Sequence, residues 1–224
     1  TLGGNTANTS TFSGAITLNQ ALYISQIAAG TVQFSGTFTT ASNKVTKIGA
    51  GTLQRTTSAL SLSGDFEVNA GTFNANALAC SISGITTVSG GTYTASTAAQ
   101  NLNGGLTVSG GTYTGLSGTA GNTVTTNVIL SSGTLSAPGN TGTFNVSGNW
   151  TNNGGTFTHN NGTVTFNGIT QSITGSTSTT FSTLVISGSS TTPDTTLALS
   201  LAAALALMAS QRPDFGKTTT SAPS

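Results

Sequence analysis

Large apolar residues recur along this chain at a nearly constant interval. A Gly-Thr pair followed by a large apolar or aromatic residue occurs at Gly30-Thr31-Val32, Gly51-Thr52-Leu53, Gly71-Thr72-Phe73, Gly91-Thr92-Tyr93, Gly111-Thr112-Tyr113, Gly133-Thr134-Leu135 and Gly155-Thr156-Phe157. Successive copies are 20 to 22 residues apart, and the stretch from Thr87 to Thr94 returns unchanged from Thr107 to Thr114. Self-similarity at a fixed period of this size indicates a repeat architecture in which each repeat is one coil.

Within each repeat, apolar and polar residues alternate, which predicts strands and not helices. The residue three positions before each Gly is aliphatic in six of the seven repeats, and the residue two positions after it is always large and apolar. We expect two interior columns of stacked side chains. The first contains Ile27, Ile48, Val68, Val88, Val108, Leu130 and Asn152, and the second contains Val32, Leu53, Phe73, Tyr93, Tyr113, Leu135 and Phe157.

A second series of apolar residues marks another strand of the coil. It reads apolar-x-apolar-Ser/Asn-Gly and ends at Gly64, Gly148, Gly168 and Gly188, with weaker variants ending at Gly84 and Gly104. Each coil therefore carries at least two strands that end at a Gly. We expect these glycines to supply the positive φ of a sharp corner.

Stacking such coils predicts an all-β protein, a β-solenoid of about nine coils over residues 1–190. The alternative is a β-sandwich with Gly-rich turns, but a sandwich has no reason to repeat one register seven times. Residues 191–224 form a C-terminal cap or interaction segment followed by a polar tail. The outward side chains after each Gly form a ladder that consists of Thr31, Thr52, Thr72, Thr92, Thr112, Thr134 and Thr156.

The chain is unusually poor in charge. Charged residues make up 4% of it, and none lies between Glu67 and Asp194, whereas about 25% is typical. A net charge of +1 gives no steering toward nucleic acid or an anionic membrane. Little repulsion opposes self-association of such a rod. The single cysteine, Cys80, excludes an internal disulfide, and we expect it to be a small buried hydrophobe instead of an intermolecular bridge.

Two stretches of the chain carry a resemblance to a known family. Lys47 to Gln54 (KIGAGTLQ) and Val68 to Phe73 (VNAGTF) resemble the autotransporter-associated β-strand repeats of bacterial surface proteins. The resemblance extends in style over about residues 45 to 170. It implies a right-handed parallel β-helix displayed outside the cell, often as an adhesin or a fibre. The chain begins at Thr1 inside a β-like pattern, so we expect either a removed leader or a piece of a longer secreted protein.

Groups able to carry catalysis are scarce. Lys44, Lys47, Arg55, Asp65 and Glu67 concentrate the charge of the solenoid, and we interpret them as a solvated edge with weak ion pairs. The sharper alternative is a sugar- or carboxylate-binding patch, in which Asp65 and Glu67 point the same way and act as acid and base.

Cofactor and metal motifs are equally scarce. His159 is unique and lies among asparagines, which favours a solvated side chain over a metal ligand. Gly216-Lys217-Thr218 lacks the earlier Gly of a phosphate-binding loop, because position 211 is Gln. We expect no cofactor.

Beyond residue 191 the composition changes to Leu and Ala. Helix propensity is high there, yet the leucines also keep a period of two. At about 15 residues, the run is short for a membrane span, which needs about 20. We expect this segment to form a cap over the last coil. The second alternative is a segment that docks onto a neighbouring subunit, and the third is a membrane or sorting segment. The interaction residues are Leu197, Leu199, Leu201, Leu205 and Leu207.

Three functions remain in competition. The leading hypothesis is an extracellular structural or adhesive protein that assembles end to end with copies of itself, since open solenoid ends are unpaired edges. The second is binding of ice or another crystalline surface by the Thr ladder. The third is a polysaccharide-active enzyme on a β-helix, which would need carboxylates or a metal in one groove. The expected partner is the protein itself, with a cell-surface or polysaccharide ligand as the alternative.

Overall fold

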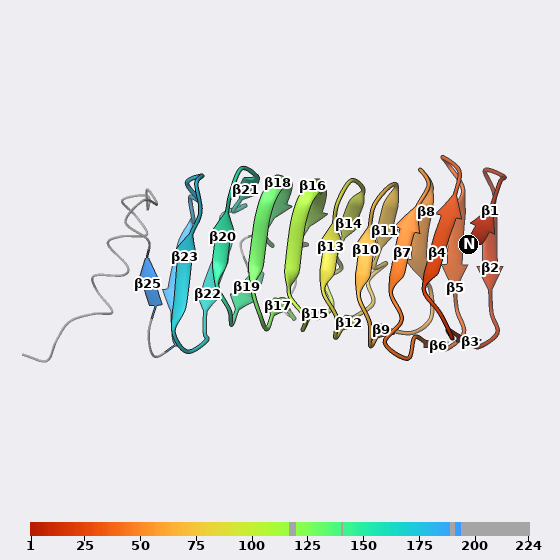
Figure 1. The fold of residues 1–224 in the computed structure, drawn as a ribbon, viewed down its shortest axis with the longest axis horizontal. Helices are drawn as coiled ribbons and strands as arrows, with labels where there is room; N and C mark the ends of the chain where they lie inside the picture. Colours follow the sequence, from red (N-terminus) through yellow and green to blue (C-terminus); the bar gives the residue numbers. More distant parts are fainter. Residues whose placement is uncertain (117–119, 140, 189–190, 194–224) are drawn as a thin grey trace, which may run out of the picture.

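The structure is a computed structural model that describes residues 1–116, 120–139, 141–188 and 191–193. It is a parallel β-solenoid of about nine coils with no helix among the described residues. Figure 1 shows the coils stacked side by side into a straight rod, with the N-terminal strands at one end and β25 at the other. Hydrogen-bonded neighbours are 20 to 23 residues apart in sequence, as in the pairs Leu22 with Val45 and Val68 with Val88. The predicted fold class is confirmed.

Each regular coil has three sides, which we call faces A, B and C. Face A contains β1 (Leu2–Gly4), β4 (Leu22–Gln26), β7 (Val45–Ile48), β10 (Phe66–Val68), β13 (Thr86–Val88), β20 (Trp150–Asn152), β23 (Gln171–Thr174) and β25 (Thr191–Pro193). Face B contains β2 (Thr9–Phe12), β5 (Thr31–Phe34), β8 (Thr52–Arg55), β11 (Thr72–Asn74), β14 (Thr92–Thr94) and β21 (Thr156–Thr158). The long strands β16 (Leu106–Thr114) and β18 (Val128–Ser136) run through both faces.

Face C is a separate parallel sheet. It contains β9 (Leu60–Leu62), β12 (Cys80–Ile82), β15 (Gln100–Leu102), β17 (Asn122–Val124), β19 (Thr143–Val146), β22 (Thr163–Phe166) and β24 (Thr183–Ile186). The short pair β3 (Ile16–Thr17) and β6 (Phe38–Thr39) lies beside β9 and extends this face toward the N-terminus. The solenoid also continues on face A into residues 191–193, where β25 pairs with β23.

The inward side chains of face B stack as the alternation predicts. Phe73 lies between Leu53 and Tyr93, and Tyr93 in turn pairs with Tyr113. Ring centroids are 4.8 Å apart for Phe73 and Tyr93, and 5.0 Å apart for the stacked pair Tyr93 and Tyr113. Offset and edge-to-face contacts at such distances stabilise aromatic cores beyond the area that they bury.

The inward column of face A differs from the prediction at its N-terminal end. Val68 pairs with Lys47 and not with Ile48, and Lys47 pairs with Ile24. Ile27 is 45% exposed and Ile48 is half-buried. The corner that follows β7 holds one residue more than the corner that follows β10, so counting back from the Gly selects the wrong side chain. From Val68 to Asn152 the predicted column is correct.

The glycines at the corner between faces C and A are required by close stacking and not by backbone conformation. Gly64, Gly84 and Gly104 are absent from the glycines with positive φ, which corrects the expectation for this series. A Cβ on Gly104 would instead overlap the backbone of Gly84 in the preceding coil. Positive φ does occur at the corner between faces A and B, at Gly71 (65°) and Gly133 (75°).

Candidate functional site: the threonine face

The outer surface of face B presents two parallel columns of polar side chains, which we call the threonine face. Each face B strand begins with an outward residue, and the residue two positions later is also outward, so each coil contributes two outward positions. The first column consists of Thr9, Thr31, Thr52, Thr72, Thr92, Thr112, Thr134 and Thr156, and the second of Thr11, Gln33, Gln54, Asn74, Thr94, Thr114, Ser136 and Thr158. The array is therefore uninterrupted over eight coils.

All seven threonines of the predicted ladder lie in register in the first column. Each pairs with its equivalent in the next coil, from Thr31 with Thr52 to Thr134 with Thr156. The sequence pattern missed an eighth member, Thr9, which pairs with Thr31. Asn8 precedes Thr9 in place of the marker Gly, but the spacing of 22 residues to Thr31 was a signal that could have found it.

The hydroxyl groups of the first column make no hydrogen bond to any described residue. Some outward hydroxyls at other places are engaged within the protein: Thr125 Oγ1 donates to the Asn103 carbonyl (2.7 Å), Ser147 Oγ donates to Asn167 Oδ1 (2.8 Å), and Thr57 Oγ1 donates to the Ser35 carbonyl (2.7 Å). Since each hydroxyl offers one donor and two acceptor positions, the first column presents its full hydrogen-bonding capacity to whatever lies above it.

The second column is partly engaged. Thr11 Oγ1 lies 3.4 Å from Gln33 Oε1, and Asn74 Oδ1 accepts a hydrogen bond from the Asn76 backbone N–H (2.9 Å). The amide side chains of the second column also make it less uniform than the first column, in which every residue is Thr. The threonine face is thus one regular column beside one mixed column.

No charge reaches this face in the part of the chain that the structure describes. Of the five charged residues there, Lys47 and Arg55 point into the core and are buried, with exposed fractions of 0% and 3%. This corrects the interpretation of both as part of a solvated edge. Lys44 and Glu67 do form the expected ion pair, at 2.7 Å.

Lys47 is held inside the corner between faces A and B. Its Nζ donates hydrogen bonds to the carbonyl oxygens of Ile48 (2.7 Å), Gly49 (2.7 Å) and Ala70 (3.2 Å). Burial lowers the pKa of this ammonium to about 8, because a low-dielectric surrounding disfavours the charged form. The three carbonyl dipoles favour the charged form and oppose that effect.

Arg55 extends from β8 into the corner between faces B and C. Its Nη1 donates to the Gly36 carbonyl (2.8 Å), its Nε to the Ser58 carbonyl (3.3 Å), and its Nη2 to the Ser58 hydroxyl. Burial lowers the pKa of the guanidinium. A void of about 10 Å³ lies beside it, which holds at most a single water. Both buried cations therefore tie coil corners together.

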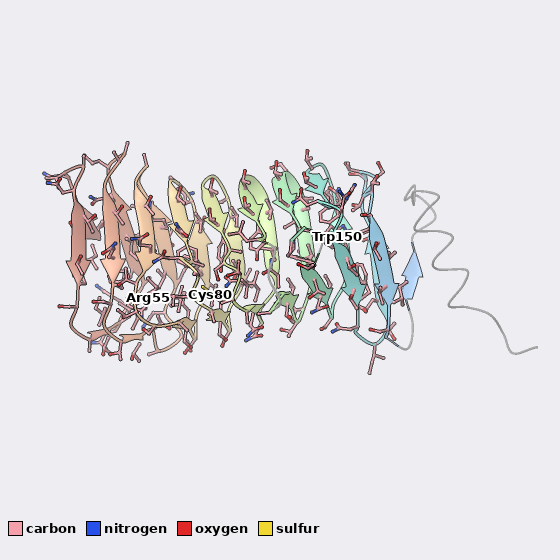
Figure 2. All side chains as sticks on the ribbon, turned by 180° about the vertical axis from the view of Figure 1, so that it is seen from behind. Arg55, Cys80 and Trp150 are labelled. Carbon is pink, nitrogen blue, oxygen red and sulfur yellow. The ribbon has the colours of Figure 1, made fainter. Side chains whose placement is uncertain are left out.

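Cys80 lies next to Arg55 in the core, as Figure 2 shows. It is free and buried, and burial raises the pKa of its thiol to about 11. The predicted role as a small buried hydrophobe is confirmed. Deprotonation at neutral pH is suppressed, so the thiol is a poor nucleophile.

The two stacked tyrosines differ in their polar contacts. Tyr93 Oη donates to Gln100 Oε1 (3.1 Å), and Gln100 Nε2 donates to Ser96 Oγ (3.0 Å). One coil later Asn122 occupies the place of Gln100, and neither Tyr113 Oη nor Asn122 Nδ2 has a hydrogen-bond partner among the described residues. The side chain of Asn is one methylene shorter than that of Gln, which accounts for the lost contact.

The proposed acid–base pair is engaged in structural contacts. Asp65 Oδ1 accepts a hydrogen bond from the Ile85 backbone N–H (2.8 Å), and Glu67 Oε1 accepts one from Ser89 Oγ (2.6 Å). Burial alone would raise the pKa of Glu67, but the hydrogen bonds from Lys44 and Ser89 and the charge of Lys44 lower it overall. A carboxyl whose pKa is lowered is poorly suited to donate a proton at neutral pH.

The remaining predicted residues add no reactive group. His159 is half-buried, and its Nδ1 accepts a hydrogen bond from the Asn161 backbone N–H (3.0 Å). Within the described ranges, no three His, Cys, Asp or Glu residues gather as metal ligands. Leu197, Leu199, Leu201, Leu205 and Leu207 lie outside the described residues. No helix of the described part is long and apolar enough to cross a membrane.

The class of protein is defined by the fold alone: a three-faced parallel β-solenoid with a filled core. Comparison with protein-family models, with curated proteins and with solved structures finds no match to this chain.

Proposed function

We propose that this protein is a non-catalytic structural rod of an extracellular surface, and that copies of it associate end to end into a fibre. The observation that carries the proposal is the continuous parallel pairing of the coils together with an outer surface that is almost free of charge. Coils that are each hydrogen-bonded to the next transmit force along the rod. The filled core leaves a rod that resists bending instead of a cleft for a substrate.

Strand edges at the first coil support end-to-end association. β1, β2 and β3 are each paired on one side only within the described chain. Their inward residues Leu2, Phe12 and Ile16 are only partly buried against the core. A further coil would pair with these strands and cover these side chains. Unpaired strand edges are templates for another chain, and the charge-poor surface offers little repulsion against it.

The extracellular location rests on the resemblance of residues 45–170 to autotransporter-associated repeats. The surface chemistry fits it, because hydroxyl and amide groups keep the rod hydrated without charge. Display as an adhesin would use one of the polar faces.

Electron microscopy of the purified chain tests the fibre. We expect filaments whose axial repeat equals the length of one subunit, and their number should rise with protein concentration. A strictly monomeric species at millimolar concentration would overturn the proposal.

A pair of variants of the first coil tests the site of contact. Leu2→Lys places a charge at an inward position that a neighbouring subunit would bury, which is costly for an unpaired charge. Thr11→Lys adds the same charge to the same coil but on the outward side. We expect Leu2→Lys to abolish filaments and Thr11→Lys to retain them. Equal filament formation by the two variants would show that the first coil is not the contact.

A further inference from the structure

The threonine face differs from the other two faces in ways that point to a binding surface. The outward column of face A mixes chemistries, since Tyr23, Glu67 and Ile129 interrupt its threonines. Face C mixes Ser, Asn and Thr and ends with Val185. Face B alone presents two outward columns that stay polar and uncharged over eight coils.

The geometry of the threonine face is a two-dimensional lattice. Its repeat along the rod is the interstrand distance of about 4.8 Å, and its repeat across the face is two residues of strand, about 6.7 Å. Thr is branched at Cβ and has few rotamers, and each side chain stands on a hydrogen-bonded strand. Little conformational entropy is therefore lost when the face binds a partner.

The chemistry of this lattice favours binding to an extended solid over binding to a soluble molecule. A single neutral hydrogen bond exchanged with water contributes little net free energy, and this face has neither a charge nor an aromatic ring to anchor a small ligand. A solid with its own repeating hydrogen-bonding groups engages many hydroxyls at once, so weak contacts add without a new entropic cost for each.

We propose that the threonine face binds ice. The hydroxyls of the first column, which have no partner among the described residues, can each donate one and accept two hydrogen bonds, so they can join a lattice of waters that each donate two and accept two. Their methyl groups form no hydrogen bonds and so do not compete for those of the adjoining water. Charged groups keep a strong shell of liquid-like water, and this face has none. A lattice of single waters also adapts to the spacing of the face more readily than a polysaccharide, whose repeat is covalently fixed.

Matched variants within the same two coils test this inference. Thr92→Lys with Thr112→Lys places charges at the centre of the threonine face, whereas Thr87→Lys with Thr107→Lys places them on face A of the same coils. All four threonines are half-buried and outward, so both double variants make the same chemical change. Circular dichroism and thermal unfolding would establish that both remain folded.

The readout is the growth and recrystallisation rate of ice in protein solution. We expect the unmodified chain to slow growth and facet the crystals, the face B variant to lose activity by about tenfold because charges must be desolvated on binding, and the face A variant to stay within about twofold, because its charges lie off the contact surface. Unchanged ice growth with the unmodified chain, or equal losses in both variants, would overturn the inference. Retention on crystalline cellulose or chitin without any effect on ice would overturn it in favour of a polysaccharide.

This inference does not depend on fibre formation. The Leu2→Lys chain leaves the threonine face intact and should slow ice growth even where it forms no filaments. Failure of one proposal is thus distinguishable from failure of the other.

Discussion

At the scale of single residues, the most informative side chain is Lys47. It occupies an inward position between Ile24 and Val68, where every pattern of alternation expects an aliphatic residue. The buried ammonium satisfies three carbonyl oxygens at a corner, so it exchanges hydrophobic packing for hydrogen bonds that the turn would otherwise lack. Such a group makes the stability of this coil depend on pH.

The direction of that dependence follows from its pKa. The folded value is lowered to about 8, whereas an unfolded chain has about 10.4. The unfolded state therefore binds more protons between these values, and the contribution of Lys47 to the free energy of unfolding rises with pH across this window, by ~1–2 kcal/mol after allowance for its carbonyl partners. Cys80, Tyr93 and Tyr113 act in the opposite direction at alkaline pH, since their pKa values are raised in the fold.

A comparison with Lys47→Met isolates this effect. Urea unfolding of both chains between pH 7 and pH 10 cancels the contribution of the thiol and the phenols. We expect the stability of the variant relative to the unmodified chain to fall as the pH rises. A difference that stays constant over the range would contradict the assignment.

At the scale of the elements, the corner between faces C and A decides how closely the coils can stack. Gly104 lies directly over Gly84, so a side chain has no room at this position of the corner. The sequence pattern located these glycines correctly but attributed them to positive φ. That reason could not be checked from one sequence, because a corner Gly demanded by conformation and one demanded by close approach look the same.

Gly104→Ala should therefore be destabilising by about 2–4 kcal/mol, because its Cβ forces the backbones of two coils apart. Gly14 is the matched control: a Cβ there meets nothing within 4 Å, and its φ is not in the left-handed region. Gly14→Ala should be neutral or slightly stabilising. Urea unfolding followed by the fluorescence of the buried Trp150 measures both, and equal effects would refute the stacking argument.

The remaining strands show which features could be predicted from the sequence and which could not. The Gly-Thr pattern located the strands of faces A and B, and the second series located face C, because both follow the alternation of buried and exposed residues. The same pattern missed Thr9 and misplaced Ile27, Ile48, Lys47 and Arg55. These residues precede or flank irregular corners, and a corner that gains one residue reverses the face on which the next side chain lies.

At the scale of the whole molecule, each coil contacts mainly its two neighbours, so stability is close to a sum of coil and interface contributions. The two identical octapeptides allow a clean test. Deleting residues 87–106 joins Thr86 to Thr107 and restores the local sequence of the junction. The chain should fold into a rod one coil shorter, by about 4.8 Å.

Small-angle scattering and circular dichroism would measure this change. A control deletion of residues 87–96 removes half a coil and places outward residues in the core. We expect that control to lose its cooperative unfolding transition, whereas the full-coil deletion keeps it with lower stability. Loss of the fold in both chains would show that the coils are not interchangeable.

The repetition of the octapeptide has a consequence for how the gene evolves. Because the edge of one coil is equivalent to the edge of the next, an in-frame duplication of one coil's codons yields a longer protein whose junctions are already satisfied. Where the codons of the two copies are also alike, slippage and unequal recombination are favoured at this locus. Lineages that carry this gene should therefore differ in rod length by whole coils, and selection could tune reach without inventing a new fold.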